Sequence, residues 1–259
     1  MRTVTATRYV TPLREGGSLP AIVEADDGTY VCKFRGAGQG PKALIAELVA
    51  GEIARTLGLP VPELVFLELD PVLGRSEADP EIRDLILGSA GLNLGMDFLP
   101  GSIGFDAAID RAELNRDLAS RIVWFDAFVM NVDRTARNPN LLLWHRNLSL
   151  IDHGAALYFQ HNWATASEVV VSAFPLVRDH VLLSRASHIA AADAQAAALL
   201  NEGELERISG LIPDAWLTEP SAFEGPAAER EAYARSLKTR LANRANFVEE
   251  AARAHQALL

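Results

Sequence analysis

Two aspartates and an asparagine in the second half of the chain have side chains that can bind a metal ion or accept a proton. Asp133 and Asn138 lie five residues apart in a polar, proline-bearing stretch. Asp152 follows an apolar run and stands directly before His153 and Gly154. Amide and carboxylate oxygens are the hard ligands that Mg²⁺ takes into its octahedral shell, and an aspartate is able to accept or orient a hydroxyl proton. The order Asp-x-x-x-x-Asn followed by Asp-x-Gly therefore indicates metal-assisted phosphoryl transfer.

A lysine and a glutamate further upstream supply complementary charges. Lys33 lies in the middle of a β-prone run, between Cys32 and Phe34. Glu47 is the carboxylate in a stripe of small residues at helical spacing. The stripe consists of Ala43, Glu47, Ala50, Gly51 and Ala54. A carboxylate on such a closely packed face needs a cation, and in phosphoryl transfer a lysine neutralises phosphate oxygens while a glutamate fixes its position.

Each of these residues taken alone also fits an ordinary structural role. Lys33 fits an edge strand with a solvated ammonium, and Glu47 fits an exposed position beside an alanine face. Asp133, Asn138 and Asp152 each fit the capping and turn positions that Asp and Asn commonly occupy in loops. The complete set in this order goes beyond what those roles require, so the set as a whole favours the chemical interpretation.

The elements that carry Lys33 and Glu47 are predicted to be strands and one helix. The β-prone runs 19–24 and 29–34 are separated by a segment that ends in Asp-Gly, which indicates a hairpin. Residues 41–57 are predicted to form a helix that ends at Gly58. Residues 92–99 return to strand character.

The second part of the chain is predicted to be mainly helical. A helix is expected over residues 111–129, followed by a polar loop at 131–140 and a short hairpin over 141–151. Residues 70–80 are expected to form a loop, and the alanine-rich residues 227–259 a helical stretch. The change from strands to helices near residue 100 indicates an α+β fold with two lobes.

The composition of the chain limits the kinds of partner that it is expected to bind and the compartment in which it is expected to lie. The chain contains 24 Lys and Arg residues and 34 Asp and Glu residues, so its net charge is −10. This balance argues against nucleic acid or an anionic membrane as partner. The single cysteine, Cys32, leaves no internal disulfide, and no apolar run reaches the roughly 18 residues of a membrane span. We therefore expect a cytoplasmic protein.

Residues 10 to 160 resemble the HipA-like kinases, which are distant relatives of protein kinases and phosphoinositide kinases. The segments that carry the resemblance are 30–34 (Tyr-Val-Cys-Lys-Phe), 46–62 with its Leu-Gly-Leu-Pro-Val-Pro exit, 125–140, and 151–154 (Ile-Asp-His-Gly). The resemblance implies a bilobal protein-kinase-like fold. It places a strand-rich N-lobe at residues 1–100 and a mainly helical C-lobe at residues 101–259.

The resemblance also implies roles for individual residues, with ATP and Mg²⁺ as cofactors. Lys33 would contact the ATP phosphates and pair with Glu47. Asp133 would be the catalytic base, and Asn138 and Asp152 would bind the metal ion.

Two further segments would bind the nucleotide on the same resemblance. Gly16, Gly17 and Ser18 would form the phosphate loop, in which Ser18 is either a self-phosphorylation site or a plain turn residue. Phe98 and Leu99 belong to the segment between the lobes, whose backbone would meet adenine.

Several alternatives stay open at this stage. The phosphoryl acceptor is expected to be a protein Ser or Thr, but the Asp-His-Gly sequence is closer to the phosphoinositide-kinase style and leaves a small molecule or lipid as acceptor. A catalytically silent nucleotide- or partner-binding module is the other alternative. The six histidines form no zinc pattern, and no serine lies in a Gly-x-Ser-x-Gly context.

Overall fold

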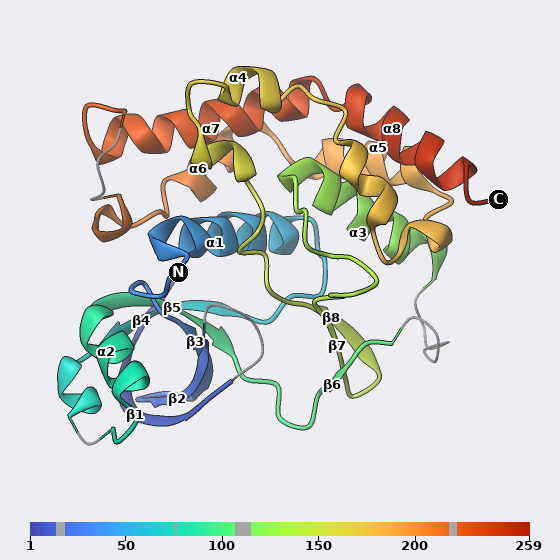
Figure 1. The fold of residues 1–259 in the computed structure, drawn as a ribbon. Coiled ribbons are helices and arrows are strands. Elements are labelled where there is room, and N and C mark those ends of the chain that lie inside the picture. The colour runs from blue at the N-terminus through green and yellow to red at the C-terminus, as the bar shows by residue number, and fades with distance from the viewer. Residues whose placement is uncertain (14–18, 76, 107–114, 218–221) are drawn as a thin grey trace.

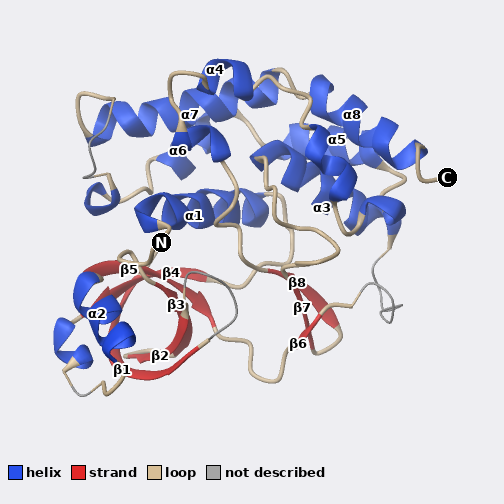
Figure 2. Cartoon of the chain, viewed as in Figure 1, coloured by secondary structure: helices blue, strands red, loops and turns tan. Residues whose placement is uncertain are grey.

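The chain divides into a β-barrel near its N-terminus and a helical region that contains most of the remaining residues (Figure 1). The computed structural model describes residues 1–13, 19–75, 77–106, 115–217 and 222–259. In Figure 2 the strands occupy the lower half of the view, and all labelled helices except α2 occupy the upper half. The expected change from strands to helices along the chain is confirmed.

Five strands close into a barrel in the order β1-β2-β3-β5-β4. They are β1 (Thr3–Pro12), β2 (Ala21–Ala25), β3 (Thr29–Lys33), β4 (Leu64–Leu69) and β5 (Gly91–Asp97). The pairs are antiparallel except for β1 with β4, which are parallel. The hairpin of β2 and β3 was predicted, whereas the long first strand that closes the barrel was not.

Alternation along β3 decides which side chains enter the barrel. Tyr30 and Cys32 are buried in the apolar cluster inside the barrel, and Val31 and Lys33 therefore lie on the opposite face. The helix α2 (Pro80–Gly88) adds its buried side chains to the interior cluster. The interior is thus apolar, and Lys33 is directed out of it.

The helix α1 (Gly40–Thr56) lies between the barrel and the helical region (Figure 1). A proline stands in its first turn, and Gly58 follows its end with φ +64°, a left-handed conformation that favours glycine. Gly51 makes the contact with the barrel possible, because an added Cβ would lie 2.5 Å from Leu64 Cδ1. The helix is therefore buried along most of its length, as the small-residue stripe predicted.

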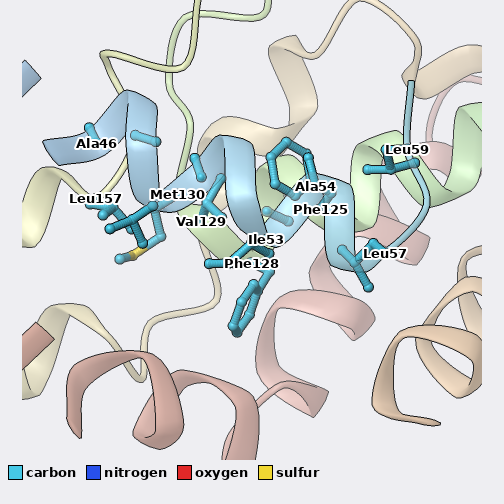
Figure 3. Packing of buried hydrophobic residues seen from close by; sticks show 14 of the residues in the cluster. Ala46, Ile53, Ala54, Leu57, Leu59, Phe125, Phe128, Val129, Met130 and Leu157 are labelled. Atoms are coloured by element: carbon cyan, nitrogen blue, oxygen red, sulfur yellow. The ribbon is translucent and has the colours of Figure 1, made fainter. Parts of the chain in front are cut away.

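The other side of α1 packs against α3 (Arg116–Val129). Figure 3 shows Ile53 and Ala54 of α1 in one apolar cluster with Phe125 and Phe128 of α3. The core of the molecule thus runs continuously from the outer wall of the barrel through α1 into the helical region.

A three-stranded sheet combines one strand before α3 with two strands after it, and its last strand leads to Asp152. It consists of β6 (Ile103–Gly104), β7 (Leu141–Trp144) and β8 (Asn147–Leu150), in the order β6-β7-β8. The turn between β7 and β8 places His145 and Arg146 at φ +49° and +69°, which suits a tight hairpin. This hairpin was predicted from the sequence.

The remaining helices cover α1 and α3 on the side away from the barrel (Figure 1). They are α4 (Ala166–Val169), α5 (Ile189–Leu199), α6 (Glu202–Ser209), α7 (Pro226–Ala242) and α8 (Ala245–Gln256). Short 3-10 helices occupy Pro71–Gly74 (η1), Tyr158–His161 (η2), Pro175–Asp179 (η3), Leu183–Arg185 (η4) and Asp214–Trp216 (η5). Within the described ranges, no helix is both long enough and apolar enough to span a bilayer.

Three expected elements differ in the structure. The loop at 70–80 contains η1, because Pro71 stands in its first turn and the Asp70 side chain accepts a hydrogen bond from the Val72 amide. The stretch 227–259 is broken after Ala242, where the Asn243 side chain donates to the Thr239 carbonyl at 2.8 Å. Within the described residues, the helix expected from residue 111 starts at Arg116.

Candidate active site

The Lys33 ammonium lies between two carboxylates, one 14 and the other 119 residues further along the sequence. Lys33 Nζ donates to Glu47 Oε2 at 2.6 Å and also to Asp152 Oδ1. The Lys33 side chain is 11% exposed and that of Glu47 is 1% exposed, whereas Asp152 is 47% exposed. The barrel, α1 and the end of β8 thus each contribute one charge to the same point.

The charges of this cluster stabilise one another against burial. Burial alone lowers the pKa of the Lys33 ammonium, but the negative charges of Glu47 and Asp152 outweigh it and raise this pKa above its ordinary value. Burial likewise raises the pKa of Glu47, but Lys33 and the bonds from His153 bring it well below its ordinary value. Lys33 and Glu47 are therefore both charged at neutral pH.

His153 is a member of the site that sequence reasoning missed. Its backbone amide donates to Glu47 Oε2 at 2.7 Å, and its ring Nδ1 lies 3.2 Å from Glu47 Oε1. The ring is buried and packs edge-on against Phe125, with 5.6 Å between the centroids. Its place directly after Asp152 was the available signal. His153 ties Glu47 on α1 to the turn that carries Asp152.

The loop between α3 and β7 presents Asp133 and Asn138 side by side. Asn138 Nδ2 donates to Asp133 Oδ2 at 2.8 Å, and Asn140 Nδ2 lies 3.4 Å from the same oxygen. Among the described residues, nothing donates to Asp133 Oδ1. Asn140 also approaches the backbone carbonyl of Asp152 at 3.4 Å, so it connects the loop to the metal-binding candidate. Sequence reasoning singled out Asp133 and Asn138 but not Asn140.

Two of these residues adopt left-handed backbone conformations. Asn140 has φ +48° and Asp152 has φ +54°. Asn and Asp are the residues other than glycine that tolerate this region best. The residue types at these turns therefore fit the backbone as well as the chemistry.

Asp126 on α3 is fully buried, and its carboxylate accepts hydrogen bonds from residues of the loop between α3 and β7. Asp126 Oδ2 accepts from Arg134 Nε at 2.7 Å, and Asp126 Oδ1 accepts from Asn131 Nδ2 at 2.8 Å. Burial by itself raises the pKa of Asp126, yet the Arg134 charge brings it well below its ordinary value. Arg134 also donates to the carbonyls of Asn140 and Ile151. Asp126 and Arg134 were not predicted, because in the sequence they read as ordinary helix and loop residues.

The remaining predicted site residues are only partly placed. Gly16, Gly17 and Ser18 lie outside the described residues. Phe98 and Leu99 follow the end of β5, as expected for a segment that leaves the barrel. The Phe98 amide donates to the Thr29 carbonyl at 3.0 Å, so a nucleotide base would have to pair with another group of this segment.

The donor set at Asp152 and Asn138 suits Mg²⁺. Asp152 keeps an exposed carboxylate, and Asn138 donates through its nitrogen to Asp133, which directs its amide oxygen away from that contact. In the part of the chain that the structure describes, no group of three His, Cys, Asp or Glu side chains converges on one point. One carboxylate and one amide, completed by phosphate oxygens and water, is the usual way in which proteins hold Mg²⁺ beside a nucleotide.

Comparisons with known proteins identify the family of the chain. A family model described as HipA-like kinase matches residues 7–250. No curated protein matches the chain. The chain is similar in structure to the proinflammatory kinase CtkA of Helicobacter pylori, with 14% sequence identity and a TM-score of 0.57 over 100% of this chain and 99% of that one. This likeness concerns the fold, whereas the family model matches nearly the whole sequence. The chain therefore belongs to the HipA-like kinase family, and is a phosphotransferase.

Proposed function

We propose that the chain is an ATP- and Mg²⁺-dependent kinase that transfers the γ-phosphoryl group to a hydroxyl of a protein Ser or Thr, its own chain included. The family implies ATP as the phosphoryl donor, generally with a divalent metal ion. The observation that carries the proposal is the Lys33 ammonium between Glu47 and Asp152, with Asp133 and Asn138 in the loop joined to Asp152 by Asn140.

In this proposal Lys33 binds the phosphates of ATP. Its ammonium lies on the outer face of the barrel, and Glu47 together with His153 fixes its position. Phosphate oxygens would replace Asp152 as its second anionic partner, which leaves the Asp152 carboxylate free for the metal ion. The role of Glu47 is then to orient Lys33 before the nucleotide arrives.

Asp133 serves the acceptor hydroxyl. Its Oδ2 is held by Asn138 and Asn140, which leaves Oδ1 for the acceptor hydroxyl. The acceptor oxygen forms a bond to the γ-phosphorus while the bond from that phosphorus to the bridging oxygen of ADP breaks. Asp133 orients the hydroxyl and takes up its proton.

Asn138 and Asp152 would hold the Mg²⁺ ion. When bound, the ion neutralises the negative charge that builds up on the phosphate oxygens. Asn138 is linked to Asp152 by hydrogen bonds through Asp133 and Asn140. Their spacing therefore follows from the same loop that positions Asp133.

We extend the proposal to the bilobal arrangement of the chain. Residues 1–100 form the N-lobe and residues 101–259 the C-lobe, with Phe98 and Leu99 at the connection beside adenine. Gly16, Gly17 and Ser18 form the phosphate loop. A cytoplasmic enzyme without nucleic-acid or membrane partners is consistent with the net charge of −10.

The proposal is tested by incubation with Mg²⁺ and γ-labelled ATP, followed by intact-mass measurement. The wild type should gain about 80 Da per phosphoryl group, and Asp133→Asn should gain none while its melting temperature still rises with Mg-ATP. The exposed carboxylate of Asp84 on α2 provides the matched control, because Asp84→Asn removes a charge outside the site.

A second part of the experiment separates the classes of acceptor. A mixture of Ser- and Thr-containing peptides, and separately vesicles that contain phosphoinositides, are added with the labelled ATP. Label on peptides supports the proposal, whereas label on the lipid alone shows a lipid kinase. A wild type that binds Mg-ATP but labels nothing, and also fails to hydrolyse ATP, is a silent module.

A further inference from the structure

A buried histidine that the proposed reaction does not use contacts the carboxylate of Asp126. This carboxylate holds the loop 131–140, here called the catalytic loop because it carries Asp133. His180 Nε2 lies 2.9 Å from Asp126 Oδ2, and the His180 side chain is almost fully buried. His180 comes from the segment after η3, 54 residues further along the chain than Asp126. Asp126 therefore has partners on both sides, with Arg134 and Asn131 from the loop and His180 from this later segment.

The hydrogen bonds of His180 define its protonation. The backbone amide of Leu182 donates to His180 Nδ1 at 3.0 Å, so this nitrogen carries no proton. Nε2 then carries the ring proton and donates it to Asp126. Both ring nitrogens are thus occupied in one neutral tautomer, with the proton assigned from the pattern of hydrogen bonds.

The backbone near His180 is joined to the catalytic loop as well. Thr135 and His180 form an isolated antiparallel bridge. The Val181 amide donates to the Arg134 carbonyl at 3.1 Å. The backbone at His180 and Val181 is therefore bonded to the loop, and the His180 side chain anchors this segment to α3.

Asp126 is linked to Asp133 through two nearby loop residues, Asn131 and Arg134. Asn131 Oδ1 accepts from the Asp133 amide at 3.1 Å, and the amide of Asn131 in turn donates to Asp126. Arg134, the next residue after Asp133, is held by the same carboxylate. The backbone of Asp133 is thus fixed on both sides by groups that depend on Asp126.

We propose that His180 is a positioning residue for phosphoryl transfer, which acts through Asp126 to hold Asp133 at the acceptor hydroxyl. The inference rests on the proposed function of Asp133. Within the described part of the chain, His180 is bonded to Asp126, Leu182 and Thr135, and not to Lys33, Glu47 or Asp152. Loss of the His180 side chain should therefore slow transfer and leave nucleotide binding intact.

Steady-state kinetics of ADP release from Mg-ATP, with and without a mixed Ser/Thr peptide acceptor, test the proposal. His180→Leu should lower kcat roughly 10- to 100-fold, the range expected when a catalytic group is displaced by about 1 Å. The KM for ATP and the Kd of a fluorescent ATP analogue should stay within about twofold. His180→Gln keeps an N–H donor that reaches Asp126, so it should restore most of kcat.

His255 provides the matched control. It is a buried histidine at 9% exposure against 8% for His180, and its Nδ1 bonds to the Leu183 carbonyl rather than to a side chain of the loop. His255→Leu should lower the melting temperature to a similar degree as His180→Leu but leave kcat unchanged. Equal kcat values for the two leucine variants overturn the positioning role.

Hydrogen–deuterium exchange provides a readout that does not depend on activity. The amides of Thr135 and Asn138 are bonded within the loop, and peptides over residues 131–140 should take up deuterium faster in His180→Leu than in the wild type, His180→Gln or His255→Leu. Peptides over α1 should not change. Unchanged exchange at 131–140 in His180→Leu contradicts the proposal.

The two measurements separate this inference from the proposed function. A wild type without turnover contradicts the proposed function, whatever the exchange experiment gives. A wild type with turnover, together with a His180→Leu variant that loses affinity for the ATP analogue in proportion to kcat, assigns His180 to nucleotide binding and overturns the role proposed here.

Discussion

Lys33 carries one positive charge between two carboxylates, one buried and one half exposed. A buried ammonium is tolerated only when it is paired and hydrogen-bonded. Glu47 meets that need permanently, because it is itself held by the His153 amide. In the proposed function, Asp152 meets it only until phosphate oxygens compete for the same ammonium. The two carboxylates thus have different parts to play although both contact the same nitrogen.

The pairing of Lys33 with Glu47 predicts non-additive effects. Lys33→Met and Glu47→Gln should each lower the rate of phosphoryl transfer, and the double variant should lose less than the product of the two factors, because each change already removes the pair. Rates of all four proteins at saturating Mg-ATP complete the cycle. Combining Lys33→Met with Asp84→Asn gives the comparison, since these residues share no contact. Multiplicative losses for Lys33 and Glu47 as well would show that their pairing has no part in catalysis.

Glu47 should also make the protein sensitive to acid. Its pKa is lower in the folded chain than the ordinary value of 4.5, so its contribution to the free energy of unfolding is complete above that value and is lost as the pH falls below it. Melting temperatures between pH 6 and pH 3 should therefore fall less steeply for Glu47→Gln than for the wild type. Parallel curves would contradict the low pKa.

At the scale of elements, α1 connects the barrel to the helices. Its N-terminal turn is held by Gln160, whose Nε2 donates to the Lys42 carbonyl at 3.2 Å and whose Oε1 accepts from Tyr233. Its C-terminal turn is held by Thr56, which donates to Glu204 of α6 at 2.8 Å. Both ends of α1 are therefore fixed to the helical region, which keeps Glu47 in place while Lys33 belongs to the barrel.

A second connection between elements depends on one buried arginine. Arg240 on α7 donates to the carbonyls of Ala127 and Phe128 at the end of α3, and to those of Val170 and Ser172. Its guanidinium also lies 4.6 Å from the centroid of the Phe247 ring. Burial lowers its pKa to about 10, so it remains charged at neutral pH. The planar guanidinium joins α7 to the end of α3 and to the segment that contains Val170 and Ser172.

Arg240→Lys should destabilise the fold although it keeps the charge. A lysine cannot bond this many carbonyls in one plane, so several carbonyls lose a charged donor, at a cost of about 2–5 kcal/mol in the free energy of unfolding. Urea denaturation measures this difference. Arg235→Lys, at an exposed position on the same helix, should change it by less than about 0.5 kcal/mol. An Arg240→Lys variant as stable as the wild type would mean that the four carbonyl contacts contribute little.

Across the whole molecule, the proposed function requires the barrel and the helical region to bind the same Mg-ATP. Mg-ATP should raise the melting temperature, because a ligand that binds only the folded state stabilises it by about 2.7 kcal/mol at 100 times its Kd. Asp152→Ala should reduce this shift, since it removes the proposed metal ligand that follows β8. ATP with EDTA should give a smaller shift than Mg-ATP for the wild type and the same shift for both proteins. An unmoved wild-type melting curve with saturating Mg-ATP would contradict the kinase proposal.

Local patterns in the sequence were sufficient to find several of the strands and helices and the residue types of the site. Alternation in residues 29–34 placed Lys33 opposite Cys32, and the Asp-Gly pair set the hairpin. The small-residue stripe and its glycine exit defined α1 around Glu47. These features depend on neighbours within a few residues, so propensity and periodicity were sufficient to find them.

Only the tertiary structure decided which of these residues meet. Lys33 and Asp152 are 119 residues apart in the sequence, and Glu47 and His153 are 106 apart. The parallel pairing of β1 with β4, the contact of His180 with Asp126 and the burial of Arg240 have no local signal at all. Such contacts arise because elements distant in the sequence bury their apolar faces together, and the polar groups trapped between them must then find one another as partners.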